Sequence, residues 1–281
     1  MPVANVRGVK INYEVLGEHG PWLVLIPGGR RSYEEFVSLG HKITAKGFRV
    51  LLHDRRNTGA SQIVIDGCEG EEEIWADDLA ILLRQLGGTP AFIGGASSGA
   101  RMSVLVYLRH PEVVSGLCLM RITGGEFAAG RLPEMYYGQF IRAAQEDGML
   151  GVCATEQYRE RIAANPTNHD YLMHMNSKRY IEVMSRWQEI FMRGPIAPMM
   201  GVRESDLRSI RVPTIIIPGN DKTHSSASGR ATQTIIPGSK LFELPIVDKD
   251  VPLLMFSDWT EHEPAIARAF AEFMDRIAEA H

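Results

Sequence analysis

The chain has 281 residues, of which 44% are hydrophobic and 23% charged, and its formal net charge is −4. A mildly acidic balance without a block of basic residues argues against nucleic acid and membrane partners, and no apolar run reaches the ~20 residues of a membrane span. The N-terminus does not resemble a signal peptide, and the three cysteines lack CxxC spacing. We therefore expect a cytoplasmic protein without a disulfide framework or a cysteine-based zinc site.

Short apolar runs alternate with amphipathic helical patterns along most of the chain. The first residues read as an antiparallel hairpin around Gly8. The later runs are continuously apolar, which indicates strands that are covered on both faces. These predicted strands are Trp22–Pro27, Phe48–His53, Pro90–Gly94, Val114–Ile122 and Val212–Pro218. Such alternation predicts an α/β fold with a mostly parallel, doubly wound sheet.

The alternation breaks between about Phe127 and Arg208, where helical patterns and eight of the 13 methionines occur. We expect a helical insertion over residues 127–208, and a core made of residues 1–126 and 209–281. Ordinary core packing is the default interpretation of each methionine or aromatic residue in the insertion. As a set they also suit the wall of an apolar pocket, where we expect Tyr137 and Trp187 to contact substrate.

The strongest chemical signal is a G-x-S-x-G motif at Gly95–Gly99, centred on Ser97, between a buried strand and an apolar helix. In that context the motif forms a sharp turn that raises the serine hydroxyl above the sheet. The turn also aims the backbone N–H of Ser98 at a developing oxyanion. A loop that only packs helix against strand is the alternative, but the context favours a nucleophile.

At these residues the chain resembles the α/β-hydrolase fold superfamily, and the resemblance covers nearly the whole chain. Pro27-Gly28-Gly29 stands where that superfamily has His-Gly-x, which implies that the N–H of Gly29 is the second oxyanion donor. The segment Asp54–Ser61 resembles its D-x-R-G-x-G-x-S turn, with Asn57 replacing one glycine. The insertion resembles the helical cap that roofs the pocket in this superfamily.

The acid and the base follow from the same resemblance. Asp221 lies just after the predicted strand Val212–Pro218, where the superfamily has its acid. Glu126, just after the predicted strand Val114–Ile122, is a rival acid. The usual histidine before the last helix is absent from its place. His262 lies a few residues late, and His224 lies shortly after Asp221. Chain order favours His262, with His224 as the second candidate.

The resemblance implies a serine hydrolase that cleaves a small or medium hydrophobic ester or lactone through an acyl-enzyme. Arg30, next to the oxyanion glycines, is a candidate for gripping an anionic group on the substrate. A C–C bond hydrolase with the same triad and a non-catalytic ligand-binding homologue are the alternatives. Metal and nucleotide motifs are absent, so we expect no metal and no cofactor. Homo-oligomer formation is left open.

Overall fold

The computed structural model describes residues 2–279, and its eight strands form one sheet in the order β1-β2-β4-β3-β5-β6-β7-β8. The contacts of β2 with β1 and β4 are antiparallel, and all other neighbouring strands are parallel. The predicted α/β fold with a mostly parallel sheet is confirmed. The strands are β1 (Val3–Val6), β2 (Val9–Leu16), β3 (Trp22–Ile26), β4 (Arg49–His53), β5 (Ala91–Ala96), β6 (Val114–Met120), β7 (Thr214–Ile217) and β8 (Lys240–Leu241).

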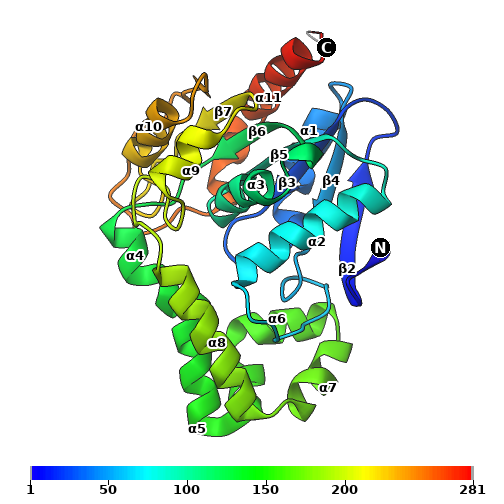
Figure 1. Ribbon diagram of the computed structural model, residues 1–281, viewed down its shortest axis with the longest axis vertical. Coiled ribbons are helices and arrows are strands. Elements are labelled where there is room, and N and C mark those ends of the chain that lie inside the picture. Colours follow the sequence, from blue (N-terminus) through cyan, green and yellow to red (C-terminus); the bar gives the residue numbers. More distant parts are fainter. Residues whose placement is uncertain (1, 280–281) are drawn as a thin grey trace.

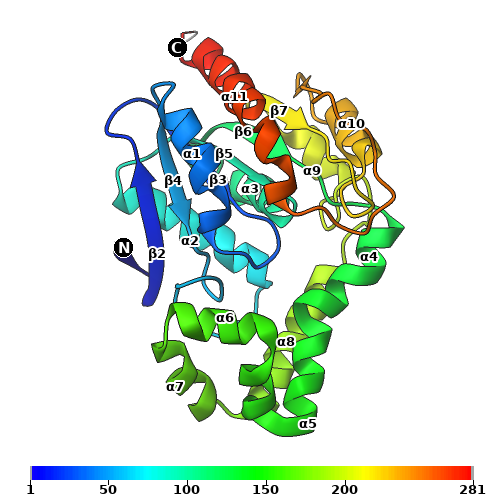
Figure 2. The ribbon, with the colours of Figure 1, turned by 180° about the vertical axis from the view of Figure 1, so that it is seen from behind.

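Helices cover both faces of the sheet (Figures 1 and 2). One face is covered by α1 (Val37–Thr44) and α11 (Glu263–Ala278), which contact each other. The other face carries α2 (Glu71–Gln85), α3 (Ser98–Arg109), α9 (Glu204–Ser209) and α10 (Ser226–Ile235). Because both faces are buried, the central strands are continuously apolar.

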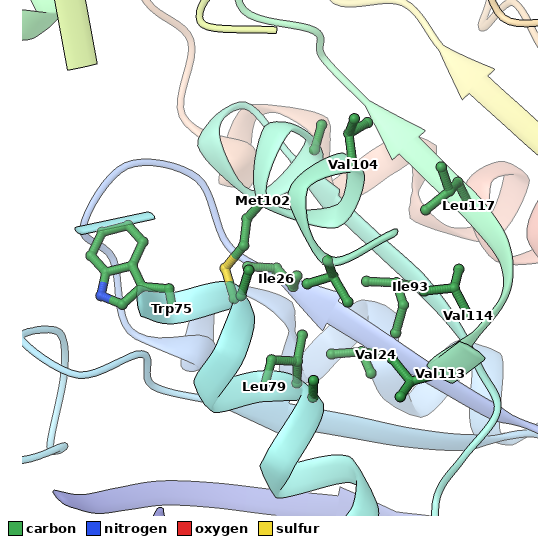
Figure 3. Close-up of a cluster of buried hydrophobic side chains, with 14 of the residues drawn as sticks. Val24, Ile26, Trp75, Leu79, Ile93, Met102, Val104, Val113, Val114 and Leu117 are labelled. Carbon is green, nitrogen blue, oxygen red and sulfur yellow. The ribbon is translucent and has the colours of Figure 1, made fainter. Parts of the chain in front are cut away.

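The core beneath α2 and α3 fixes the position of the strand ends that carry the candidate site. Figure 3 shows Ile26 and Ile93 of the sheet facing Leu79 of α2 and Met102 of α3. All four side chains have no exposed surface. Burying one aliphatic side chain of this kind stabilises a fold by roughly 1.5–3 kcal/mol. The turn after β5 is therefore built on a rigid base.

Between β6 and β7 the chain leaves the sheet and forms five helices, which we call the cap helices; the last four lie at the bottom of Figure 1, and the first connects them to the sheet. A π-helical turn, Glu134–Gly138, joins the first two of them. The helix after the cap, α9, returns to the sheet, where Leu207 is fully buried. The division into domains at residues 127 and 208 stays a prediction. The cap helices are α4 (Glu126–Pro133), α5 (Gln139–Ala154), α6 (Glu156–Ala164), α7 (Thr167–His174) and α8 (Ser177–Met192).

The cap helices form a hydrophobic cluster together with Ile63, Ile65 and Ile74 of the core. Phe140, Tyr158, Tyr180 and Met184 are at most 1% exposed in it. Most of the cap's large apolar side chains therefore pack against one another rather than against a ligand site. Among the described residues, none of the helices combines the length and apolar character needed to span a bilayer.

Candidate active site

Ser97 lies at the turn between β5 and α3, in a strained backbone conformation. Its φ is 60° and its ψ is −122°, a region that residues other than glycine rarely adopt. A Cβ on Gly95 would lie 2.4 Å from the Ile26 carbonyl oxygen, and a Cβ on Gly99 would lie 2.0 Å from it. Only glycine fits at both positions, which is the reason for the G-x-S-x-G spacing.

His224 contacts both Ser97 and Asp221. Its Nε2 lies 2.8 Å from Ser97 Oγ, and its Nδ1 lies 3.0 Å from each carboxylate oxygen of Asp221. The backbone N–H of His224 also donates to Asp221 Oδ1 at 2.8 Å, so a tight turn after β7 holds the acid and the imidazole together. The structure thus aligns a hydroxyl, an imidazole and a carboxylate, all from loops at one edge of the sheet.

His262, which chain order favours, lies elsewhere. It is the last residue before α11, where its ring packs edge-on against Trp259 and its Nε2 lies 3.5 Å from Glu261. The backbone of Leu254 occupies the place beside the acid instead, because its N–H donates to Asp221 Oδ2 at 3.0 Å. The structure therefore brings His224, and not His262, to Ser97. The rival acid Glu126 lies exposed at the start of α4.

Arg121, directly after β6, completes the surroundings of the acid. Its Nη2 donates to Asp221 Oδ2 at 2.8 Å, lies 3.3 Å from His224 Nδ1, and also donates to the Leu254 carbonyl. Burial opposes ionisation of Asp221, but hydrogen bonds from His224 and Leu254 and the charge of Arg121 hold its pKa well below the usual range. Burial, assisted by Arg121, lowers the pKa of His224 although the bond to Asp221 raises it.

The candidate oxyanion donors lie beside the serine. A Cβ on Gly28 would lie 3.1 Å from Ser97 Cβ, so the loop after β3 touches the nucleophile turn. The Ser98 hydroxyl donates to the Gly29 carbonyl at 3.1 Å and ties the two segments together. The backbone N–H groups of Gly29 and Ser98 thus belong to one continuous rim around Ser97.

Two cavities meet at Arg101 of α3. The smaller, of about 190 Å³, lies next to Ser97 and is lined by Ser98, Arg101, Thr123, Leu132 and Tyr136. The larger, of about 350 Å³, lies between α2, α3 and the cap helix α8, and Arg101, Tyr137 and Trp187 are among its lining residues. The proposed substrate contacts Tyr137 and Trp187 therefore border the larger cavity rather than the one beside the serine.

Arg30 is committed to a partner within the protein. Its guanidinium forms two hydrogen bonds with the Glu71 carboxylate, and both side chains are almost completely buried. The burial penalty is outweighed by Glu71, so the pKa of Arg30 is raised. Arg30 is also absent from the walls of the two cavities, and these two observations together count against the role expected for it.

Several residues of the site have no counterpart among the sequence-based candidates. Thr123 Oγ1 lies 3.0 Å from Ser97 Oγ, and a Cβ on Gly29 would lie 3.6 Å from the Tyr136 hydroxyl. Arg121 and Thr123 follow β6 immediately, and the carboxyl ends of parallel strands are where α/β folds gather their ligand-binding residues. Their position at the end of a predicted strand could therefore have identified Arg121 and Thr123 as site residues. Tyr136 comes from the cap, where the sequence offers no comparable signal.

Comparisons with known proteins agree with this architecture. A family model for the alpha/beta hydrolase fold matches residues 21–164. The uncharacterized hydrolase YraK of Bacillus subtilis (strain 168) is 33% identical over 111 residues, which are 39% of this chain and 40% of YraK. The sn-1-specific diacylglycerol lipase ABHD11 of Mus musculus is 32% identical over 143 residues, which are 50% of this chain and 44% of ABHD11. The chain thus matches less than half the length of either relative.

Among solved structures, the enol-lactonase from Burkholderia xenovorans LB400 is similar over 98% of this chain and 100% of its own, with a TM-score of 0.66 and 21% identity. At this level of identity the similarity concerns the fold alone. The family model covers half of the sequence, and the sheet order, the serine turn and the strand-end loops agree with it. The chain belongs to the α/β-hydrolase fold family.

Proposed function

We propose that this protein is a serine hydrolase of carboxylic esters or lactones, with Ser97 as nucleophile, His224 as general base and Asp221 as the acid that orients it. The observation that carries the proposal is the 2.8 Å contact between His224 Nε2 and the hydroxyl of Ser97, together with the 3.0 Å contacts on the other side of the ring. Nucleophile and base within hydrogen-bond reach, with the base held by a third group, is the arrangement that activates a serine.

In the proposed reaction, Ser97 Oγ bonds to the substrate carbonyl carbon while His224 Nε2 accepts the hydroxyl proton. The backbone N–H groups of Gly29 and Ser98 hold the resulting oxyanion. The intermediate expels the alcohol portion, which receives the proton from His224, and leaves an acyl-enzyme. Water attacks the acyl carbon as His224 accepts its proton. The second intermediate then releases the acid, and His224 returns the proton to Ser97 Oγ.

The wall of the cavity beside Ser97 supports an apolar acyl group, because it includes Leu132 and Tyr136 from the cap. These side chains suit contact with a short hydrocarbon chain, and the alcohol portion would extend toward the neighbouring cavity near Trp187. The printed names of the relatives include a diacylglycerol lipase and an enol-lactonase, which is in keeping with ester or lactone chemistry.

The alternatives have different standing. The displaced histidine is the reason to consider a non-catalytic homologue, and the His224 contact removes that reason. C–C bond hydrolysis uses the same three side chains, so the residues of the site do not distinguish it from ester hydrolysis. Turnover of a β-diketone without turnover of any ester would favour C–C bond hydrolysis.

The test is steady-state hydrolysis of p-nitrophenyl acetate and butyrate. Ser97→Ala is expected to lower kcat/KM by about 10³-fold or more, because the residual rate comes only from binding and the oxyanion donors. Ser103→Ala is the matched control: this serine is fully buried in the same helix and donates to the Gly99 carbonyl at 2.8 Å. It is expected to keep most of the activity. Equal rates for wild type and Ser97→Ala would refute the proposal.

A further inference from the structure

Of three buried arginines near Ser97, two form salt bridges with buried carboxylates and one does not. Arg30 pairs with Glu71, and Arg101 pairs with Glu72, all with little exposed side-chain surface. Arg55 is only 2% exposed, yet no carboxylate among residues 2–279 forms a salt bridge with it. Buried charges in proteins are normally paired. The buried carboxylate of Asp54 accepts from Asn12, Tyr33 and Ala60 instead of Arg55. Arg55 is therefore a buried cation without a direct counter-ion.

Arg55 lies directly behind the oxyanion rim. Its Nη1 lies 3.4 Å from Ser98 Oγ and its Nη2 lies 3.3 Å from the Arg31 carbonyl oxygen, both near the upper limit for a hydrogen bond. Its Nε has no hydrogen-bond partner in the described part of the chain. Trp75 stacks on the guanidinium at 4.8 Å, but stacking on a face leaves the donating edge unsatisfied. Burial lowers the pKa of Arg55 to about 10, so it stays a cation at neutral pH.

Arg101 is paired with Glu72 as Arg30 is with Glu71, but unlike Arg30 it lines the cavity beside Ser97. It follows Ser98 by one helical turn in α3, so its side chain lies on the same side of the helix. Its two Nη atoms donate to Met200 O and Glu72, whereas its buried Nε has no partner among residues 2–279. Two arginine edges with unused donors thus flank the serine turn, and arginine edges match the geometry of a carboxylate.

We propose that the substrate is a small ester or lactone with a free carboxylate, which Arg55 and Arg101 hold on one side of Ser97. This inference rests on the proposed function and assigns its substrate class. The carboxylate would give Arg55 a direct counter-ion, while Leu132 and Tyr136 contact the hydrocarbon part from the cap side. Arg55 and Arg101 would thus bind the anionic group that the sequence assigns to Arg30.

The first experiment compares an anionic substrate, mono-p-nitrophenyl glutarate, with its neutral methyl ester. For wild type we expect kcat/KM to be at least about tenfold higher for the anion, because hydrogen bonds to a charged group are stronger than those to a neutral one. In Arg55→Met and Arg101→Met this ratio should fall by about tenfold or more. Arg109→Met, which removes a surface arginine paired with Asp77, should leave the ratio unchanged.

A competition measurement on wild type covers the case in which the variants do not fold. Glutarate should inhibit hydrolysis of p-nitrophenyl butyrate competitively, and pentanamide at the same concentration should not. Wild-type turnover of both glutarate esters without preference, or no inhibition by glutarate, would overturn this inference and leave the serine hydrolase proposal intact. If neither glutarate ester nor the butyrate is hydrolysed, the proposed function fails, and the substrate class fails with it.

Discussion

Among single residues, Arg121 places a positive charge beside both the acid and the candidate base. Its Nη2 lies 2.8 Å from Asp221 Oδ2 and 3.3 Å from His224 Nδ1. A protonated imidazole would face this cation and Arg131 of the cap, with Asp221 as the opposing charge. Part of the carboxylate's hydrogen-bonding capacity also goes to Arg121 instead of the imidazolium. The arrangement keeps His224 neutral at lower pH at the expense of its basicity.

The activity should depend on pH through His224. His224 must be neutral to accept the Ser97 proton, so kcat/KM falls as the pH decreases through the pKa of His224. Burial is the largest cause that lowers this pKa from 6.5, with Arg121 and Arg131 adding to it against the bond from Asp221. We expect the acidic limb of the wild-type profile below pH 6.5. Arg121→Gln should move that limb to higher pH.

The measurement is kcat/KM for a neutral ester across the acidic range. Arg109→Gln serves as control because Arg109 also pairs with an aspartate, Asp77, but on the surface. Its profile should coincide with that of wild type. An Arg121→Gln limb that stays in place or moves to lower pH would contradict the role given to this arginine.

At the scale of elements, the serine turn depends on how closely β3 approaches the start of α3. A Cβ on Gly99 would lie 2.0 Å from the Ile26 carbonyl oxygen and 2.8 Å from that of Pro27. Both obstacles are backbone atoms, which cannot turn aside as a flexible side chain does. The distance between strand and helix is thus set by the absence of a side chain.

Gly99→Ala should therefore lower the free energy of unfolding by about 2 kcal/mol or more, as backbone clashes typically do. Gly130→Ala is the matched control, since Gly130 lies exposed in α4, where an added Cβ would have nothing within 4 Å. Alanine there should be neutral or stabilise by up to about 1 kcal/mol. Urea unfolding of the two variants checks this, and equal midpoints would contradict it.

The elements themselves were largely predictable, and the histidine was not. Continuous apolar runs marked β3 to β7 because both faces of these strands are buried. Chain order favours His262, whereas in the structure a local turn, in which Asp221 accepts a hydrogen bond from the His224 N–H, brings His224 to the acid. The short spacing between Asp221 and His224 is the only feature of the sequence that indicates this turn. Arg30 and Glu71 are 41 residues apart in the sequence, and no sequence pattern predicts that they pair.

At the scale of the whole molecule, the cap is tied to the core by the segment that follows the turn after β4. Asn168 of α7 accepts from the Ile63 N–H at 2.9 Å and donates to the Ser61 carbonyl at 3.1 Å. Asn165 donates to the Ala60 carbonyl at 3.0 Å, and Tyr171 accepts from the Ile65 N–H at 3.1 Å. Hydrogen bonds to extended backbone therefore hold the far end of the cap.

Asn168 is 1% exposed, so Asn168→Ala leaves two buried backbone groups without their partner. Each such group costs about 1–3 kcal/mol, and we expect the free energy of unfolding to fall by about 2 kcal/mol or more. His169→Ala, at the neighbouring half-exposed position, should change it by less than about 0.5 kcal/mol. Urea unfolding compares the two. Faster hydrogen exchange at Ile63 in Asn168→Ala alone would locate the loss, and unchanged exchange there would contradict it.

The central claim is that Ser97 is an activated nucleophile whose base is His224. Intact mass after exposure to a fluorophosphonate tests it most directly, in wild type, Ser97→Ala, His224→Ala and His262→Ala. We predict one rapid label on wild type and on His262→Ala, none on Ser97→Ala, and labelling slowed by about 10³-fold or more on His224→Ala. An unlabelled but folded wild type, or a loss of labelling in His262→Ala with labelling kept in His224→Ala, would contradict the account.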